Sequence, residues 1–145
     1  MSDVPSHVRM YLVRHGEAKS KEEDPERGLT EAGRADVNRI AVWAAAAGIR
    51  AGEVRHSGKL RAQQTAEIVA EHLVVRPAEA IRDEQRDIML VGHLPFLERL
   101  ASLLIAGGAE TGVVSLDAGA LLELTQTENG WTATCLMQPR LLPGS

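Results

Sequence analysis

The sequence predicts an α/β fold in which a mostly parallel sheet has an antiparallel C-terminal edge. Two short apolar runs, Met10–Val13 and Ile88–Val91, are typical of buried strands. Stretches with helical spacing lie between the predicted strands, which is typical of parallel strands joined by helical crossovers. The pair Asn129-Gly130, set between two later strand-like stretches, predicts a hairpin at the C-terminal edge.

Composition favours one globular domain over residues 1–145, because 44% of the residues are hydrophobic and 25% are charged. Only 3% are aromatic, so the core must consist of Ala, Leu, Val and Ile. The net charge of −4 argues against a nucleic-acid partner held by bulk electrostatics, although it leaves room for a local basic pocket. We expect a monomer without internal repeats.

Cysteine use and hydropathy predict a cytoplasmic protein. The single Cys135 excludes an intrachain disulfide and fits a reducing compartment. Residues Met1–Met10 have no apolar core of signal-peptide length. The longest apolar run, Ile40–Ala47, is too short to span a bilayer, so we expect no membrane partner.

The first strand and helix are predicted at Val8–Val13 and Thr30–Ala47, joined by the charged loop Glu17–Arg27. The hydroxyl of Thr30 can accept a hydrogen bond from a free amide of the first turn, which makes this residue a suitable N-cap. Apolar residues recur at helical spacing after it, and Gly48 is a plausible helix stop.

A second strand is predicted at Glu53–His56 and a second helix at Lys59–Leu73. Lys59 and Arg61 lie in the first turn of that helix, where the helix dipole disfavours cations. Their position makes sense if an anion binds nearby. The alternative is that both side chains are simply exposed, which costs little.

The second half of the chain is predicted to contain a short edge strand, a short helix, a buried strand, a helix that follows Pro95, two hairpin strands and an irregular tail. In order, these elements are Val74-Val75-Arg76, Ala78–Arg86, Ile88–Val91, Phe96–Ala106, Ala118–Thr125, Trp131–Met137 and Pro139–Ser145.

Four cationic or nucleophilic side chains follow the ends of the predicted parallel strands: Arg14, His15, Arg61 and His93. The carboxyl ends of parallel strands form the usual ligand crevice of an open α/β sheet. With no paired acid, these groups would repel one another when charged, and a dianionic phosphoryl group between them would relieve that repulsion. Taken alone, Arg14 and His15 could equally be a surface cation and an ordinary strand-end residue.

Four motifs in order resemble those of the histidine phosphatase superfamily, also called the phosphoglycerate-mutase-like fold. They are spread from Met10 to about Gln138 and read Arg14-His15-Gly16-Glu17-Ala18, Leu29-Thr30-x-x-Gly33, Ser57-x-x-x-Arg61-Ala62-x-x-Thr65 and Gly92-His93-Leu94-Pro95. The resemblance implies a three-layer α/β/α sandwich. The short length and the Gly-His-Leu-Pro form are similar to the SixA branch, the small phosphohistidine phosphatases.

The resemblance also implies a mechanism that needs no metal and no cofactor. His15 would be the nucleophile and would become phosphorylated. Arg14 and Arg61 would hold the phosphoryl oxygens, His93 would donate to them, and water would then hydrolyse the intermediate. A zinc site on the two histidines lacks Cys or carboxylate partners at ligand spacing.

The lead hypothesis from the sequence is a metal-independent phosphatase of protein phosphohistidine. Two alternatives stay open: a phosphatase of a small phosphate ester, such as a sugar phosphate, and a non-catalytic phosphate-binding module. A phosphate ester is the less favoured substrate, because its alkoxide leaving group needs a proton.

Two further residues and one segment are singled out. Glu17 is either a substitute acid or a loop carboxylate that orients Arg14 or caps a helix, and we favour the second role. The resemblance to the small branch, which has an Arg just before the Leu-Thr pair, implies that Arg27 contacts the substrate from the rim. Relatives usually have a longer segment where this chain has only Val74–Asp87. Either that segment has been lost, or a mobile loop is missing from the sequence, which we favour.

Overall fold

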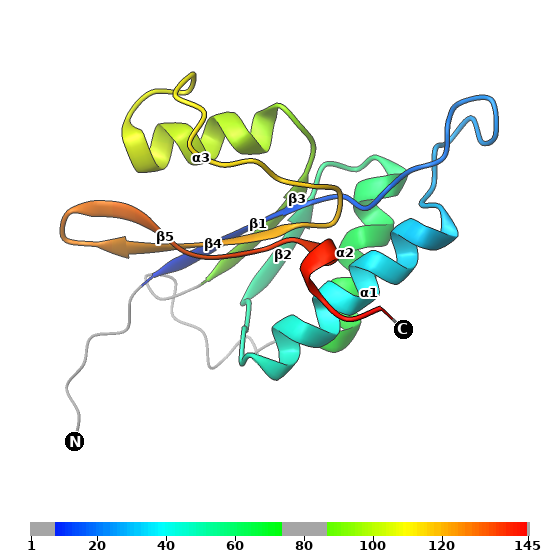
Figure 1. Cartoon of the computed structure of the whole chain (residues 1–145), viewed down its shortest axis with the longest axis horizontal. Coiled ribbons are helices and arrows are strands. Elements are labelled where there is room, and N and C mark those ends of the chain that lie inside the picture. Colours follow the sequence, from blue (N-terminus) through cyan, green and yellow to red (C-terminus); the bar gives the residue numbers. More distant parts are fainter. Residues whose placement is uncertain (1–7, 74–86, 145) are drawn as a thin grey trace.

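The computed structural model describes residues 8–73 and 87–144 and confirms the α/β fold (Figure 1). Within these residues, strands and helices alternate up to the third helix, and the chain then forms a hairpin. The elements are β1 (Arg9–Arg14), α1 (Glu31–Ala46), β2 (Glu53–His56), α2 (Leu60–His72), β3 (Ile88–Gly92), α3 (Phe96–Ala106), β4 (Leu121–Thr127), β5 (Gly130–Met137) and a 3₁₀ helix at Pro139–Leu141.

The described strands form one mixed sheet in the order β2-β3-β1-β4-β5. Strands β2 and β1 both pair in parallel with β3, while β4 and β5 run antiparallel at the other edge. This arrangement confirms the predicted parallel sheet with an antiparallel C-terminal edge. The register pairs Arg14 with Gly92 and His56 with Val91, so the carboxyl ends of the three parallel strands lie level.

Helices cover both faces of the sheet, which confirms the three-layer arrangement (Figure 1). Val13 and Met89 belong to the core on the side of α1 and α2, whereas Leu12 packs with Leu97 on the side of α3. Neighbouring residues of β1 are therefore buried on opposite faces, as a central strand requires. On its face, α3 packs mainly against β1 and β5, which leaves β2 and β3 less covered.

The predicted cap of the first helix is confirmed, because the Thr30 hydroxyl accepts a hydrogen bond from the Gly33 amide at 2.9 Å. The prediction that β4 begins at Ala118 is wrong. Ala120 donates to the carbonyl of Asp117 at 2.9 Å and Gly119 has a φ of 83°, so a turn precedes the strand, which begins at Leu121.

The tail at Pro139–Ser145 was expected to be irregular, and this is wrong for Pro139–Leu141, which form a 3₁₀ helix. Such a short helix has no periodicity that a sequence could reveal. The predicted edge strand at Val74-Val75-Arg76 and helix at Ala78–Arg86 lie outside the described residues. Within the described ranges, no helix is long and apolar enough to cross a membrane.

Candidate active site

The two strand-end histidines lie side by side at the carboxyl edge of the sheet. The ring centroids of His15 and His93 are 4.9 Å apart, and the ring planes are tilted by 56°. The amide of His15 donates to the carbonyl of Gly92 at 3.0 Å, so the two histidine-bearing segments are joined directly. Residues 78 positions apart in the sequence therefore face one small volume.

The ring of His15 has a defined tautomer. Its Nδ1 lies 2.7 Å from the carbonyl oxygen of Gly16, which can only accept a hydrogen bond. The neutral ring must therefore carry its proton on Nδ1 and keep the lone pair on Nε2. A fixed lone pair on Nε2 is what a nucleophilic imidazole needs.

The same environment keeps His15 neutral at physiological pH. Burial is the largest cause, and together with the charges of Arg61 and Arg14 and the neighbouring His93 it lowers the pKa of His15 to about 4. The hydrogen bond to Gly16 opposes this shift but does not cancel it. At pH 7 the ring is therefore an unprotonated base next to two permanent cations.

Arg14 is held by the segment that precedes β4. Its Nη1 donates to the carbonyl of Leu116 at 2.8 Å, and the amide of Leu116 donates in turn to the Glu98 carboxylate at 2.8 Å. The amide of Gly119 lies 3.1 Å from the carbonyls of both Arg14 and His15. The sequence did not indicate this support, because no pattern linked residues 115–119 to the first strand.

Thr65 connects the second motif to the first. Its hydroxyl is fully buried, accepts the Gly16 amide at 3.1 Å and donates to the carbonyl of Arg61 at 2.8 Å. The start of α2 is thus fixed against the turn that follows His15. Burial and the charge of Arg27 lower the pKa of Arg61.

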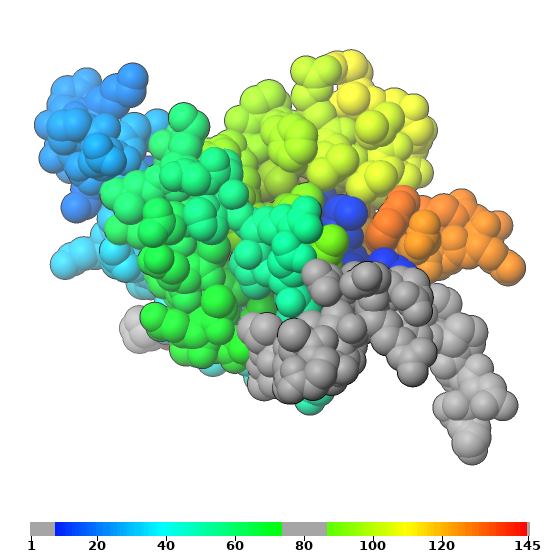
Figure 2. Space-filling view, turned by 180° about the vertical axis from the view of Figure 1, so that it is seen from behind, coloured from blue at the N-terminus to red at the C-terminus, as the bar shows by residue number. Residues whose placement is uncertain are grey.

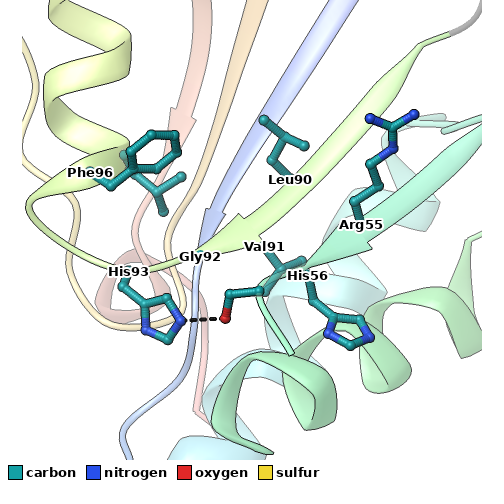
Figure 3. Close-up of a pocket in the computed structure, with 9 residues that line it drawn as sticks. Arg55, His56, Leu90, Val91, Gly92, His93 and Phe96 are labelled. Carbon is teal, nitrogen blue, oxygen red and sulfur yellow. Dashed lines mark hydrogen bonds between the residues drawn. The ribbon is translucent and has the colours of Figure 1, made fainter. Parts of the chain in front are cut away.

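Ser57 contacts His93, which the sequence analysis did not foresee. The hydroxyl Oγ of Ser57 is 2.6 Å from Nε2 of His93 (Figure 3). The same oxygen accepts a hydrogen bond from the amide of Lys59 at 3.4 Å. Burial and the charges of Arg61 and Lys59 lower the pKa of His93, which keeps this second ring neutral as well.

Glu17 and Arg27 lie at the periphery. The Glu17 carboxylate accepts the Thr30 hydroxyl at 2.7 Å at the start of α1, a contact that supports the capping role over the acid role. The Nε of Arg27 donates to the carbonyl of Lys19 at 2.9 Å, and Arg27 has a positive φ of 54°. The charged loop that they bracket projects from the body of the molecule (Figure 1).

The described part of the chain contains no cluster of three or more His, Cys, Asp or Glu side chains that could hold a metal ion. The groups that gather at the sheet edge are instead two neutral imidazoles and several cations. Guanidinium groups match the geometry of phosphate oxygens, so this set of residues can bind a phosphoryl group and present a nucleophile to it.

The family model of the histidine phosphatase superfamily (branch 1) matches residues 10–84, which include the first three motifs. The chain belongs to the histidine phosphatase superfamily. Among the curated proteins compared, none matches this sequence.

Solved structures share the fold of this histidine phosphatase. The protein histidine phosphatase SixA complexed with tungstate is 25% identical, with a TM-score of 0.76 over 92% of this chain and 99% of that chain. A protein of Agrobacterium tumefaciens proposed to be the phosphohistidine phosphatase SixA is 28% identical, with a TM-score of 0.72 over 91% and 97%. The alpha-ribazole phosphatase of Shigella flexneri is 17% identical, with a TM-score of 0.67 over 91% and 97%, and shows likeness in fold alone.

Proposed function

We propose that this histidine phosphatase removes phosphoryl groups from phosphohistidine in proteins, through an intermediate phosphorylated on His15. The observation that carries the proposal is the state of the His15 ring. Its Nδ1 is bound to Gly16, its Nε2 lone pair is left for attack, and its neighbour at 4.9 Å is the neutral ring of His93.

In the first step, Nε2 of His15 attacks phosphorus and forms a new P–N bond while the P–N bond of the substrate breaks. The substrate imidazole leaves with the bonding electron pair and takes up a proton from solvent. In the second step, water attacks phosphorus and the P–N bond to His15 breaks. Phosphate is released, and Nε2 regains its lone pair.

Arg14 and Arg61 are proposed to stabilise the charge on the transferring oxygens, and His93 to donate to one of them. Each of these groups acts on the pKa of His15, so their charges and rings lie within electrostatic range of the nucleophile. Arg27 is proposed to contact the substrate from the rim, because its charge acts on Arg61.

Phosphohistidine is the favoured substrate for three reasons. A phosphoramidate nitrogen is readily protonated, so its departure needs less help from an acid than an alkoxide does. The Glu17 carboxylate, which is the candidate acid from the sequence, already accepts a hydrogen bond from the Thr30 hydroxyl at the start of α1. The similar solved structures also include the protein histidine phosphatase SixA.

The test is phosphate release from a phosphohistidine-bearing protein, measured with EDTA present and compared with phosphoramidate and a panel of alkyl phosphates. We expect rapid release from the two phosphoramidate-type substrates, slow release from the esters, and loss of activity in a folded His15→Ala variant. Full activity in His15→Ala, or faster turnover of alkyl phosphates, would contradict the proposal.

A further inference from the structure

An apolar hollow of about 390 Å³ adjoins the candidate active site on the α3 side of the sheet. In the space-filling view, a furrow separates α3, in yellow-green, from β2, in teal (Figure 2). The hollow exists because α3 packs mainly over β1 and β5 and leaves the neighbouring face of β2 and β3 less covered.

The walls of this hollow are almost entirely apolar. Leu90 of β3 lies on the floor, and Phe96 and Leu97 of α3 form one wall. Figure 3 shows Phe96 and the Arg55 side chain of β2 on opposite sides of Leu90. Its volume falls within the range of about 300–1,000 Å³ that is typical of ligand pockets.

The hollow is continuous with the candidate active site. Ser57 and His93, which are joined by a 2.6 Å hydrogen bond, both line the hollow, and His93 is also a member of the histidine pair. A substrate that places its phosphoryl group between the two histidine rings therefore places the neighbouring part of its own chain at this opening.

Phe96 is 60% exposed even though it is the largest apolar side chain at the hollow. Burying the exposed face of an aromatic ring is favourable, so Phe96 gains free energy when an apolar group enters. A site of cationic side chains next to an apolar hollow fits a substrate that carries an apolar group close to its anionic phosphoryl group.

We propose that the hollow receives an apolar side chain that flanks the phosphohistidine of a substrate protein, and that Phe96 sets this preference. The inference rests on the proposed function, because a phosphohistidine has a peptide chain on either side that can supply the side chain. Phe96 is thus a specificity residue that contacts the substrate next to the reacting group.

The experiment compares two phosphohistidine peptides, one with Leu on both sides of the phosphohistidine and one with Ala on both sides, and inorganic phosphoramidate as a third substrate. The enzymes are the wild type, Phe96→Ala, the conservative Phe96→Leu and the control Leu103→Ala. Leu103 is 50% exposed on the same helix but does not line this hollow. Circular dichroism checks that each variant is folded.

We expect the wild type to prefer the Leu peptide over the Ala peptide by about tenfold in kcat/KM. Phe96→Ala should abolish most of this preference, Phe96→Leu should retain most of it, and Leu103→Ala should leave it unchanged. Hydrolysis of phosphoramidate, which has no flanking group, should stay within about twofold of the wild type in Leu103→Ala, and Phe96→Ala should lower it less than it lowers hydrolysis of the Leu peptide.

Two results would overturn the inference, and they are distinguishable. If both peptides are hydrolysed equally well by the wild type and by Phe96→Ala, the hollow is not a substrate subsite, while the proposed function stands. If no phosphohistidine substrate is hydrolysed at all, the proposed function fails and the subsite falls with it.

Discussion

The hydroxyl of Ser57 and Nε2 of His93 are 2.6 Å apart at the ends of two neighbouring parallel strands. This contact orients the second histidine of the pair, since the ring of His93 can otherwise turn about its side-chain bonds. Ser57 is therefore a positioning residue that acts through His93.

Replacing Ser57 tests this role. One hydrogen bond contributes about 0.5–1.5 kcal/mol, so Ser57→Ala should lower kcat by roughly three- to tenfold and change KM little. Ser57→Thr keeps the hydroxyl and should restore most of kcat. The control is Ser115→Ala, at an exposed serine whose side chain makes no hydrogen bond to the residues of the site. An unchanged kcat in Ser57→Ala would contradict the positioning role.

The protonation of His15 should be visible by NMR. Because burial and nearby cations lower its pKa to about 4, the ring should stay neutral as the pH falls through 6 and become protonated only near 4. Titration of ¹⁵N-labelled histidine measures this directly, and the His15→Asn variant assigns the signal. A midpoint near 6.5 would show that the site does not hold the ring neutral.

The same shift should make stability depend on pH. The pKa of His15 falls from an ordinary 6.5 to about 4 on folding, so the unfolded chain binds more protons between these values. The stability that this group contributes is complete above about pH 6.5 and is lost as the pH falls towards 4. Urea unfolding should show the wild type losing stability relative to His15→Asn across this window. If the stabilities of the wild type and of His15→Asn change in parallel with pH, the lowered pKa of His15 is contradicted.

Thr65 should be essential to the stability of the site. Thr65→Val keeps the shape of the side chain but leaves the buried Gly16 amide without its 3.1 Å partner, at a cost of about 1–3 kcal/mol. Activity should fall as well, because that amide belongs to the turn that holds the Nδ1 proton of His15. Thr65→Ser keeps the hydroxyl and serves as the control. Equal urea midpoints for Thr65→Val and the wild type would refute the assignment.

One substitution distinguishes the two roles considered for Glu17, which are support of the helix cap and donation of a proton in the reaction. If its carboxylate supports the cap through Thr30, Glu17→Gln should lower the free energy of unfolding by no more than about 1 kcal/mol and leave kcat within about twofold. A proton donor in the reaction would instead lose about 10²–10⁴ in kcat. Glu22→Gln, in the same charged loop, is the matched control.

Much of the framework was predictable because it depends on local signals. The apolar runs that became β1 and β3 are buried on both faces, and the Thr30 cap has a direct chemical cause. The convergence of His15 and His93 also followed, because the ends of parallel strands meet at one edge.

The contacts that complete the site could not be predicted, because they depend on how distant segments pack. Nothing in the sequence links Ser57 to His93 or Leu116 to Arg14, since both hydrogen bonds arise from the sheet order and from the turn before β4. The apolar hollow could not be predicted from the sequence either, because it depends on which strands α3 leaves less covered. The interpretation of the short segment Val74–Asp87 stays a prediction.

The central claim is that His15 accepts the phosphoryl group, and trapping that intermediate tests it most directly. A phosphohistidine protein labelled with ³²P would be mixed with the enzyme, quenched within milliseconds under alkaline conditions, and digested for mass spectrometry. We predict label on the peptide that contains His15 and none on the enzyme in His15→Ala. Label on His93 instead, or incorporation that persists in His15→Ala, would contradict the account.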